Sequence, residues 1–586
     1  MPAFTTGSLH KAKPKDLREL KGVAFRELRL SARELQSKSF ALRIEIKRIC
    51  METLAKEKKP NRKGKFYRNF IELIAVGAVT GIFAGAIVTF FNILVHEGEH
   101  ISRDAYAYVR ENPVFIPLLL FALFAGAFLI GVAVNISSVI RGCGIPQAEG
   151  GTRGIIRFKW WRDLTLMFAT CLLSIFMGLS IGAEGPSVLI GACAGDGVSA
   201  VSRRNQMIRK YQVTGGACTG LAVASNAPLT GMAFAFEEAY KRLTPEVFIC
   251  SVSSVVTGML MKNVIYRALG LEIANAFSTY TFYDLPLSAY GFVVLAGIAC
   301  GLLGVGFYKL AFLMRKAFKK VRVSNEKISH GLRIAIAVLA GGIVSFLAVS
   351  VMGGGHELIE SLGSGTAETA QSLFGLGLAG TLALVLTLKF LITTVNVGSG
   401  IPCGIFIPMI AIGACLGALL NMLWQVWGMN PVYGDLMIMI CMSAFFTTVV
   451  KAPITSIVMI CEFTGSFAHL LPVIIAVAIA YIIGELFRTE GIYEELLEQY
   501  ERETGIHERA VREVFTITLI RGAIADNRQV RDVLWPKGAR VKEIMRGEET
   551  ILPDGDTLLK SGDILTIVCK TDNGIKVKDE LSHILG

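Results

Sequence analysis

The sequence predicts an all-α, multi-pass membrane protein built from two similar halves, followed by a small α+β domain. Two observations predict the membrane part: 53% of the 586 residues are hydrophobic against 18% that are charged, and three glycine-rich motifs each lead into an apolar run. The last ~80 residues are less hydrophobic and alternate strand-like stretches with turns, which indicates a separate domain.

The N-terminal segment, residues 1–68, is strongly basic. It contains 19 Lys and Arg against 7 Asp and Glu, so its net charge of +12 equals that of the whole chain. Basic segments beside membrane spans stay on the cytoplasmic side. We therefore expect a cytoplasmic N-terminus that contacts anionic lipid and binds no nucleic acid.

The first membrane span is predicted at residues 73–95, where no residue is charged. This stretch exceeds the roughly 20 residues that span a bilayer. Residues 96–111 carry more acidic than basic side chains and are predicted to form an external loop. A second uncharged stretch, residues 113–140, returns the chain to the cytoplasm. Residues 315–333 contain seven basic residues and one acidic residue, which predicts a second cytoplasmic loop.

Three glycine-rich motifs interrupt the apolar chain: GCGIP at residues 142–146, GAEGP at 182–186 and GSGIPCGIFIP at 398–408. Each places a proline at or near the first position of the following helix, where its missing N–H costs nothing. The N–H groups at such helix starts are unpaired and carry partial positive charge. Inside a membrane, irregular backbone is tolerated only where protein buries it or where it lines a cavity. Several such helix starts directed at one point would bind an anion.

The two halves of the membrane part repeat the same pattern. Residues 186–195 align with residues 408–417. Pro228, followed nine residues later by Glu237, aligns in the same way with Pro453 and Glu462. Repeated halves with broken helices at corresponding places predict a binding site at their interface.

These motifs, in this order, resemble those of the CLC family of chloride channels and chloride/proton antiporters. The family's helix-start motifs read GSGIP, G(R/K)EGP and GGIFAP, and the resemblance covers roughly residues 69–500. It implies an inverted repeat of mostly short, tilted helices in a two-pore homodimer. It also implies a protein of the cell membrane with both termini in the cytoplasm, which transports chloride and protons, has no enzymatic activity and needs no cofactor.

Two glutamates are the candidate proton-coupling residues. Glu184 lies in the GAEGP break, where an intramembrane carboxylate is costly unless it is protonated, paired or held by helix N-termini. It resembles the family's external gating glutamate, and helix capping is the alternative. Glu238 resembles the internal proton-transfer glutamate of the antiporters. Alternatively, Glu237 or Glu238 pairs with Lys241 or Arg242 at the membrane interface.

The resemblance places the anion among Cys143, Gly144, Ile405, Phe406 and Tyr493. Ile405 and Phe406 would contribute backbone N–H groups while their side chains pack in the core. The phenol of Tyr493 would donate to the anion, although a tyrosine at the membrane interface is the ordinary alternative.

Two residues depart from the family pattern. Ala183 replaces the basic residue before the gating glutamate, which removes a positive charge from the outer vestibule. Cys143 replaces a serine at the inner anion site, and a thiol is a weaker donor than a hydroxyl. Alternatively, Cys143 points into the packing. Nitrate, bromide and fluoride therefore stay open as substrates beside chloride.

Exchange of chloride, or a similar monovalent anion, for protons is the favoured function. A passive chloride channel gated by voltage or pH is the alternative, but a channel needs no inner proton acceptor such as Glu238. A remote alternative is a zinc metalloprotease, because HEGEH at residues 96–100 matches HExxH. Gly98 weakens that helix, and a third ligand is not evident.

Residues 507–586 are predicted to form a cytoplasmic α+β domain. Residues 514–520 and 563–569 indicate strands, and the Pro-Asp-Gly at 553–555 indicates a turn. The segment LPDGDTLLKSGDIL at residues 552–565 resembles the TrkA-C domain that accompanies ion-transport proteins. This resemblance implies a regulatory domain with a possible small-molecule ligand.

Overall fold

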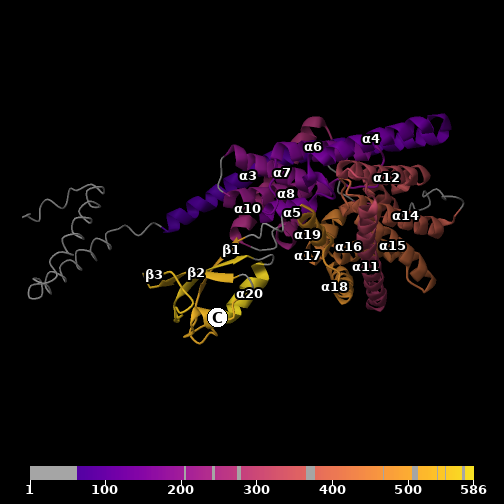
Figure 1. Cartoon of the computed structure of the whole chain (residues 1–586). Coiled ribbons are helices and arrows are strands. Elements are labelled where there is room, and N and C mark those ends of the chain that lie inside the picture. Colours follow the sequence, from indigo (N-terminus) through magenta and orange to yellow (C-terminus); the bar gives the residue numbers. More distant parts are fainter. Residues whose placement is uncertain are drawn as a thin grey trace, which may run out of the picture. The chain divides into compact units, whose positions relative to one another are not determined.

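The computed structural model describes residues 62–202, 206–239, 244–272, 277, 279–363, 376–465, 467–504, 512–536, 539–547, 549–570 and 574–586. A helical part makes up most of this chain, and a four-stranded sheet lies near its C-terminus (Figure 1). Residues 1–61 of the basic segment lie outside the described residues. So do Lys241 and Arg242, the alternative partners predicted for Glu237 and Glu238.

The helical part confirms the multi-pass prediction. Eight of its described helices are long and apolar enough to cross a membrane. Its helices are α3 (Arg62–Glu111), α4 (Ile116–Ile136), α5 (Ile145–Arg153), α6 (Trp160–Phe176), α7 (Glu184–Val201), α8 (Gln206–Ser225), α9 (Pro228–Phe234), α10 (Pro245–Leu269), α11 (Tyr290–Lys320), α12 (Glu326–Leu347), α13 (His356–Gly363), α14 (Leu378–Ser399), α15 (Phe406–Val426), α16 (Gly434–Val450), α17 (Pro453–Thr464), α18 (Leu470–Leu486) and α19 (Ile492–Thr504).

The two predicted loops are largely helical, so their prediction as loops was wrong, whereas the side of the membrane on which each lies stays a prediction. Helix α3 continues from the first span through Glu111, so residues 96–111 extend the helix. Helix α11 ends at Lys320 and α12 begins at Glu326, which leaves only residues 321–325 between them. Charge counting locates where a helix leaves an apolar environment. It does not locate where the helix ends, because Lys, Arg and Glu are good helix formers.

Helices α5, α9 and α17 are too short to span a bilayer. These helices have 9, 7 and 12 residues, against the roughly 20 that a span needs. Each has a proline in its first turn, namely Pro146, Pro228 and Pro453. The prolines therefore mark helix starts, as the motifs predict.

Matching glycines bring the broken helices of both halves against the next helix in the chain. A Cβ on Gly191 of α7 would lie 2.2 Å from the carbonyl oxygen of Gly216 on α8. In the second half, a Cβ on Gly413 of α15 would lie 2.7 Å from the carbonyl oxygen of Cys441 on α16. Gly191 and Gly413 occupy the same place in the aligned segments, so both halves use small residues for close helix packing.

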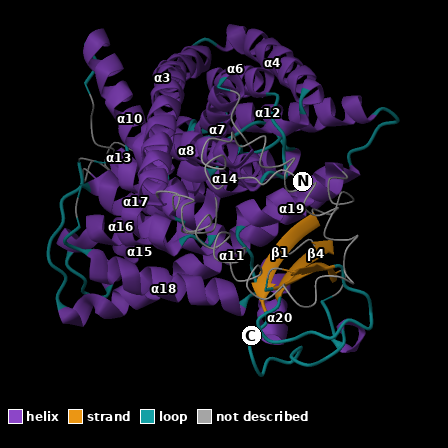
Figure 2. Cartoon of the chain, turned by 90° about the vertical axis from the view of Figure 1, so that its left-hand side faces the viewer, coloured by secondary structure: helices purple, strands orange, loops and turns teal. Residues whose placement is uncertain are grey.

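The C-terminal part is an antiparallel sheet in the order β1-β4-β2-β3, with one helix packed on it (Figure 2). Its elements are β1 (Arg512–Thr518), β2 (Ala539–Arg546), β3 (Glu549–Ile551), β4 (Ile564–Lys570) and α20 (Gly574–Leu585). Strands β1 and β4 confirm the two predicted strands, with ends shifted by at most two residues. Leu565 and Ile567 of β4 form a core with Leu581 and Leu585 of α20.

Asp563, in the KSGD segment that precedes β4, is held by three hydrogen bonds. Nε and Nη2 of Arg546 each donate to it at 2.8 Å, and the backbone N–H of Lys560 donates at 2.9 Å. Burial opposes ionisation of Asp563, but these hydrogen bonds outweigh it and hold the pKa of Asp563 below its usual value. The acid is therefore ionised and structural.

Acid should therefore destabilise the C-terminal part. Because the folded-state pKa of Asp563 lies below the unfolded value of about 3.9, its stabilisation is present above that value and is lost as the pH falls through the folded-state pKa. Asp563→Asn should lower the melting temperature of the sheet at pH 7 and flatten its acid dependence. Circular dichroism of the full chain measures both. Asp532→Asn, at an exposed position, is the control, and equal melting of the two variants would contradict the assignment.

Candidate functional site

The three glycine motifs come together in the interior of the helical part. Gly182 and Gly404 exchange two backbone hydrogen bonds, with N to O distances of 2.8 and 3.0 Å. The N–H of Gly142 donates to the carbonyl of Gly400, and the N–H of Cys403 donates to the carbonyl of Gly142, each at 3.2 Å. The third motif, from the second half, thus bonds to both motifs of the first half.

No side chain fits between the first two motifs. A Cβ on Gly144 would lie 2.5 Å from the carbonyl oxygen of Gly185, and a Cβ on Gly185 would lie 2.2 Å from that of Cys143. Gly144 also has φ of +84°, a conformation that favours glycine. Backbone atoms therefore form the middle of this site.

Helices α5, α7 and α15 all begin at this meeting point. Their N-cap residues are Gly144, Ala183 and Ile405, and none provides a side-chain cap. The first-turn N–H groups of a helix have no intrahelical acceptor and carry partial positive charge. The side chains of Ile405 and Phe406 are buried in the core, so only their backbone N–H groups are left to bind an anion. Three uncapped helix starts of this kind suit an anion.

Glu184, the first residue of α7, is 2% exposed. Its Oε1 lies 3.3 Å from Nε2 of His356, whose ring stacks on Phe277. Its Oε2 has no hydrogen-bond partner in the described part of the chain. The carboxylate also caps no described helix, which counts against the capping alternative. A buried carboxylate at three helix starts competes for the place of an anion when ionised.

A buried lysine that sequence reasoning missed lies on the Ala183 side of the site. Lys389 of α14 donates to Ser180 Oγ at 3.3 Å and to the carbonyl oxygens of Val351 and Gly353 at 3.2 Å. Ser180 lies just before the GAEGP motif, so Lys389 supplies positive charge where Ala183 has none. The available signal was a lone charge in the otherwise uncharged α14, since intramembrane charges mark functional sites.

Tyr493 of α19 is 1% exposed, and its hydroxyl has no hydrogen-bond partner among the residues described. Cys143, Glu238 and Glu184 lie within electrostatic range of this phenol. An interfacial tyrosine would keep its hydroxyl wet, and this burial counts against that alternative. A bound anion would satisfy the buried donor.

Glu237 and Glu238 have different surroundings. Glu238 is 3% exposed in a π-helical turn, Ala235–Ala239, and such turns are frequent at functional sites. Glu237 instead caps the start of α17, accepting from the N–H of Ile454 at 2.9 Å and from that of Thr455 at 2.6 Å. Glu237 is therefore a structural residue, and Glu238 is the buried acid of the two.

Glu462 makes the reciprocal cap in the other direction. It accepts from the N–H of Leu229 at 2.7 Å, from the N–H of Thr230 at 2.7 Å and from Thr230 Oγ1 at 2.6 Å, all at the start of α9. The matched acids Glu237 and Glu462 therefore each cap a helix of the opposite half. We call these contacts the reciprocal caps.

Glu462→Gln should destabilise the helical part by about 1–2 kcal/mol, because the amide keeps one acceptor oxygen and loses the charge that strengthens these bonds. Thermal aggregation of the purified protein should begin at a lower temperature, and Glu237→Gln should match it. Glu485→Gln, which removes a 55%-exposed acid paired with Lys451, is the control with little expected effect. An unchanged aggregation temperature in both cap variants would show that the caps contribute nothing.

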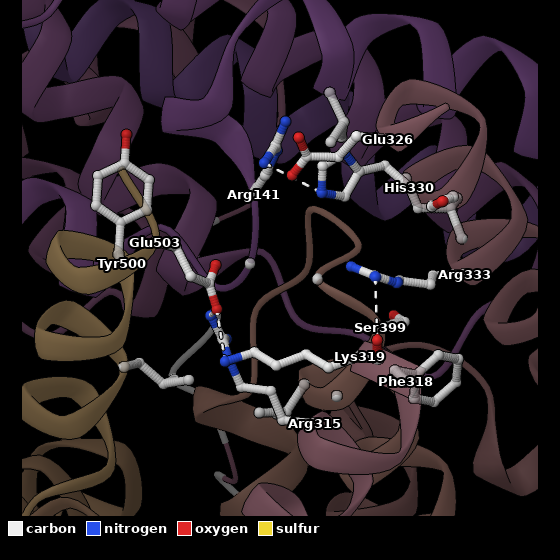
Figure 3. Close-up of a pocket in the computed structure, with 18 of the residues that line it drawn as sticks. Arg141, Arg315, Phe318, Lys319, Glu326, His330, Arg333, Ser399, Tyr500 and Glu503 are labelled. Atoms are coloured by element: carbon white, nitrogen blue, oxygen red, sulfur yellow. Dashed lines mark hydrogen bonds and ion pairs between the residues drawn. The ribbon is translucent and has the colours of Figure 1, made fainter. Parts of the chain in front are cut away.

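A cavity of about 550 Å³ opens beside the GCGIP motif (Figure 3). Gly142, Cys143 and Gly400 lie on its wall, together with several basic side chains. Cys143 is 3% exposed yet lines this cavity. The cavity therefore leads from the basic segments directly to the first helix start.

Comparison with protein families decides the identity. A family profile described as voltage gated chloride channel matches residues 125–485, and a TrkA-C domain profile matches residues 514–582.

The chain belongs to the voltage-gated chloride channel (CLC) family.

Named relatives of this CLC chain include bacterial exchange transporters. The H(+)/Cl(-) exchange transporter ClcA of Vibrio cholerae is 30% identical over 467 residues, which covers 77% of this chain and 92% of the relative. ClcA of Vibrio vulnificus is 29% identical and covers 73% of this chain and 90% of the relative.

Solved structures show the same fold. A slow cyanobacterial Cl−/H+ antiporter superposes with a TM-score of 0.65 at 23% identity, covering 74% of this CLC chain and 99% of that structure. A CLC-type fluoride/proton antiporter superposes with a TM-score of 0.53 at 21% identity, covering 72% of this chain and 97% of that structure. Similarity at these identities establishes the CLC fold of the helical part.

A further buried acid of this CLC chain, beside Glu184 and Glu238, was missed by sequence reasoning. Glu149 on α5 is fully buried, lies 3.5 Å from Arg153 and acts electrostatically on Tyr493. Glu149 and Arg153 are four residues apart, the spacing of an ordinary ion pair on an exposed helix face. The sequence pattern therefore did not indicate that Glu149 is buried. Its place three residues after Pro146 in the first broken helix was the usable signal.

The HEGEH segment is not a metal centre in the described part of this CLC chain. His96 and His100 do share a face of α3, with their Nε2 atoms 3.4 Å apart. No described His, Cys, Asp or Glu joins them as a third ligand, and Glu99 accepts from the N–H of Gly354 instead. The protease alternative therefore has no support.

Cys143→Ser in this CLC protein should shift the chloride/nitrate preference, since a hydroxyl donates more strongly than a thiol on the cavity wall. The expected effect is on the order of 1 kcal/mol, or about fivefold. Anion flux from liposomes loaded with chloride or nitrate measures it. Cys193→Ser, a buried cysteine of α7 that does not line the cavity, is the control. Equal preference in wild type and Cys143→Ser would leave selectivity to the backbone.

Proposed function

We propose that this protein exchanges chloride, or a similar monovalent anion, for protons across the cell membrane, with both termini in the cytoplasm. The observation that carries the proposal is the buried carboxylate of Glu184 at three uncapped helix starts. An ionised carboxylate occupies the place of the anion, and a protonated one releases it. The anion and the ionised carboxylate therefore exclude each other at this site, so protonation of Glu184 and binding of the anion are linked.

The second buried acid favours exchange over a passive channel. A channel can use Glu184 as a gate alone, whereas an exchanger also needs a way for protons to reach it from the other side. Glu238 is buried and lies near Tyr493, which also lies near Glu184. The relatives named as exchange transporters support the same choice.

The proposal is tested with the full-length protein in liposomes. An outward chloride gradient should drive protons inward against their own gradient, and the pH of the external solution reports this movement. Chloride flux without uphill proton movement would establish the channel alternative. Absence of both fluxes in properly folded protein would overturn transport of chloride altogether.

We also propose a homodimer in which residues 69–500 carry transport and residues 507–586 regulate it. Leu229 and Ile454, at matched positions of the reciprocally capped helices, are 48% and 63% exposed. Apolar side chains exposed at corresponding places in both halves offer a surface to lipid or to a second copy. Cross-linking in native membranes distinguishes the two. We propose no cofactor and no enzymatic activity.

A further inference from the structure

The cavity beside Cys143 is larger and more basic than the passage of a monovalent anion requires. Its volume of about 550 Å³ falls within the range of roughly 300–1,000 Å³ that small-molecule sites occupy. The basic side chains on its wall are Arg141, Arg315, Lys319, Arg322 and Arg333, and the acidic ones are Glu326 and Glu503. Five cations against two anions leave three positive charges, and one chloride ion cannot neutralise them.

Separate elements gather these charges in one place. Helix α11 supplies Arg315 and Lys319, α12 supplies Arg333, and Arg141 follows a 3-10 turn, Ser138–Ile140 (Figure 3). Arg333 repels Arg141, and Arg322 and Arg315 repel Arg333, while Glu326 and Glu503 offset part of this repulsion. A ligand with several negative charges would relieve this repulsion.

Three nitrogen atoms of the wall lack an acceptor among the described residues: Arg141 Nε, Arg315 Nε and His330 Nδ1. His330 Nε2 lies 3.3 Å from Arg141 Nη1. Because a guanidinium only donates, Nε2 is the acceptor and Nδ1 carries the ring proton. All three nitrogen atoms are buried by the protein. A ligand would therefore accept hydrogen bonds from them only after their side chains turn toward the cavity.

Glu503 of α19 already occupies part of this positive field. It pairs with Arg315 Nη2 at 3.2 Å and with Lys319 Nζ at 2.9 Å. Burial raises the pKa of Glu503, but these two cations outweigh it and hold the pKa below its usual value. Arg141, Arg322 and Arg333 form no ion pair with a described residue. Glu503 thus leaves three of the five basic side chains on the cavity wall for a ligand.

We propose that this cavity binds a small molecule with linked phosphate groups, and that the bound ligand blocks the anion path at Cys143. Phosphate oxygens match the fork of donors on a guanidinium, and their charge matches the surplus on the wall. The blocking step rests on the proposed function, whereas binding does not. The ligand would come from inorganic pyrophosphate or from a nucleotide, since both carry the same phosphate chemistry.

Isothermal titration of the purified full chain with pyrophosphate and with ATP, at fixed 0.15 M salt, tests binding without transport. At least one probe should bind at micromolar to millimolar concentration, and tighter binding of ATP would identify the nucleotide as the source. Failure of both probes to bind at millimolar concentration would overturn the proposal. That failure would leave the exchange function untouched, because the titration measures no transport.

Variants locate the ligand. Arg333→Gln should weaken binding about tenfold, the scale of one charge-assisted contact. Arg322→Gln should also weaken it, and its exposed side chain makes loss of folding a poor explanation. Lys316→Gln is the matched control, because this lysine lies on α11 beside Arg315, is exposed and does not line the cavity. Equal weakening by Lys316→Gln would show binding to diffuse surface charge and overturn the site.

Glu503→Gln should strengthen ligand binding, whereas the arginine variants should weaken it. Loss of this carboxylate frees Arg315 and Lys319 for the ligand, so binding should tighten several-fold. Weaker binding in this variant would contradict the cavity as the site. In liposomes, the probe that binds should inhibit exchange only from the face that carries the C-terminal part. Inhibition from the opposite face would overturn the blocking step.

Discussion

Replacing Glu184 with alanine should abolish proton coupling and leave passive anion flux. In the structure this carboxylate is buried at the starts of α5, α7 and α15, the place that suits an anion. Without the Glu184 carboxylate, no group at the helix starts takes up and releases a proton in competition with the anion. Anions can still bind at the helix starts. Proton uptake by liposomes should fall to the level of protein-free vesicles while chloride efflux continues.

Glu97→Ala is the control for this experiment, because Glu97 is an exposed acid of α3. Its variant should couple protons and chloride as the wild type does. Uphill proton movement that persists in Glu184→Ala would show that another acid gates the anion site. Glu149, the buried acid near Tyr493, would then be the next residue to replace.

Replacing Glu238 with glutamine should suppress proton transport while chloride still moves. Glutamine preserves the size of the side chain but cannot carry a proton, so it interrupts a relay without opening the packing around the π-helical turn. Simultaneous recording of chloride efflux and proton uptake gives the ratio of the two fluxes. This ratio should change by more than tenfold in favour of chloride, which corresponds to more than 1.4 kcal/mol.

Glu237→Gln is the matched control, since it changes the neighbouring acid in the same way. Its carboxylate caps α17, so this variant should lose stability and keep its proton-to-chloride ratio. A proton flux that is unchanged in Glu238→Gln would assign Glu238 to structure. The pair of variants thus separates a relay from a cap at adjacent positions.

Local sequence patterns predicted the helix starts of the site but not its side-chain partners. Glycine and proline restrict the backbone wherever they occur, so GCGIP, GAEGP and GSGIPCGIFIP announce broken helices on their own. The contact between Glu184 and His356 joins residues 172 positions apart, and no local periodicity records such a pair. The buried position of Lys389 likewise follows from helices packed around it.

In the C-terminal part as well, local sequence patterns predicted some elements and missed others. Strands β1 and β4 were predictable because their apolar residues dominate a short run between turns. Strand β2 reads Ala-Arg-Val-Lys-Glu-Ile-Met-Arg and contains a bulge between Val541 and Glu543. The bulge shifts the alternation that identifies a strand, so β2 carried no clear pattern. Its pairing with β3 and β4 defines it.

The reciprocal caps make each half of the helical part incomplete alone. A fragment ending before α14 would keep Glu237 without the Ile454 and Thr455 amides that it binds, and its α9 would begin without Glu462. Two copies of one half could complete each other by the same exchange, because the acids and helix starts occupy matched positions. A half-length form of this chain would therefore gain these caps only by pairing with a second copy of itself.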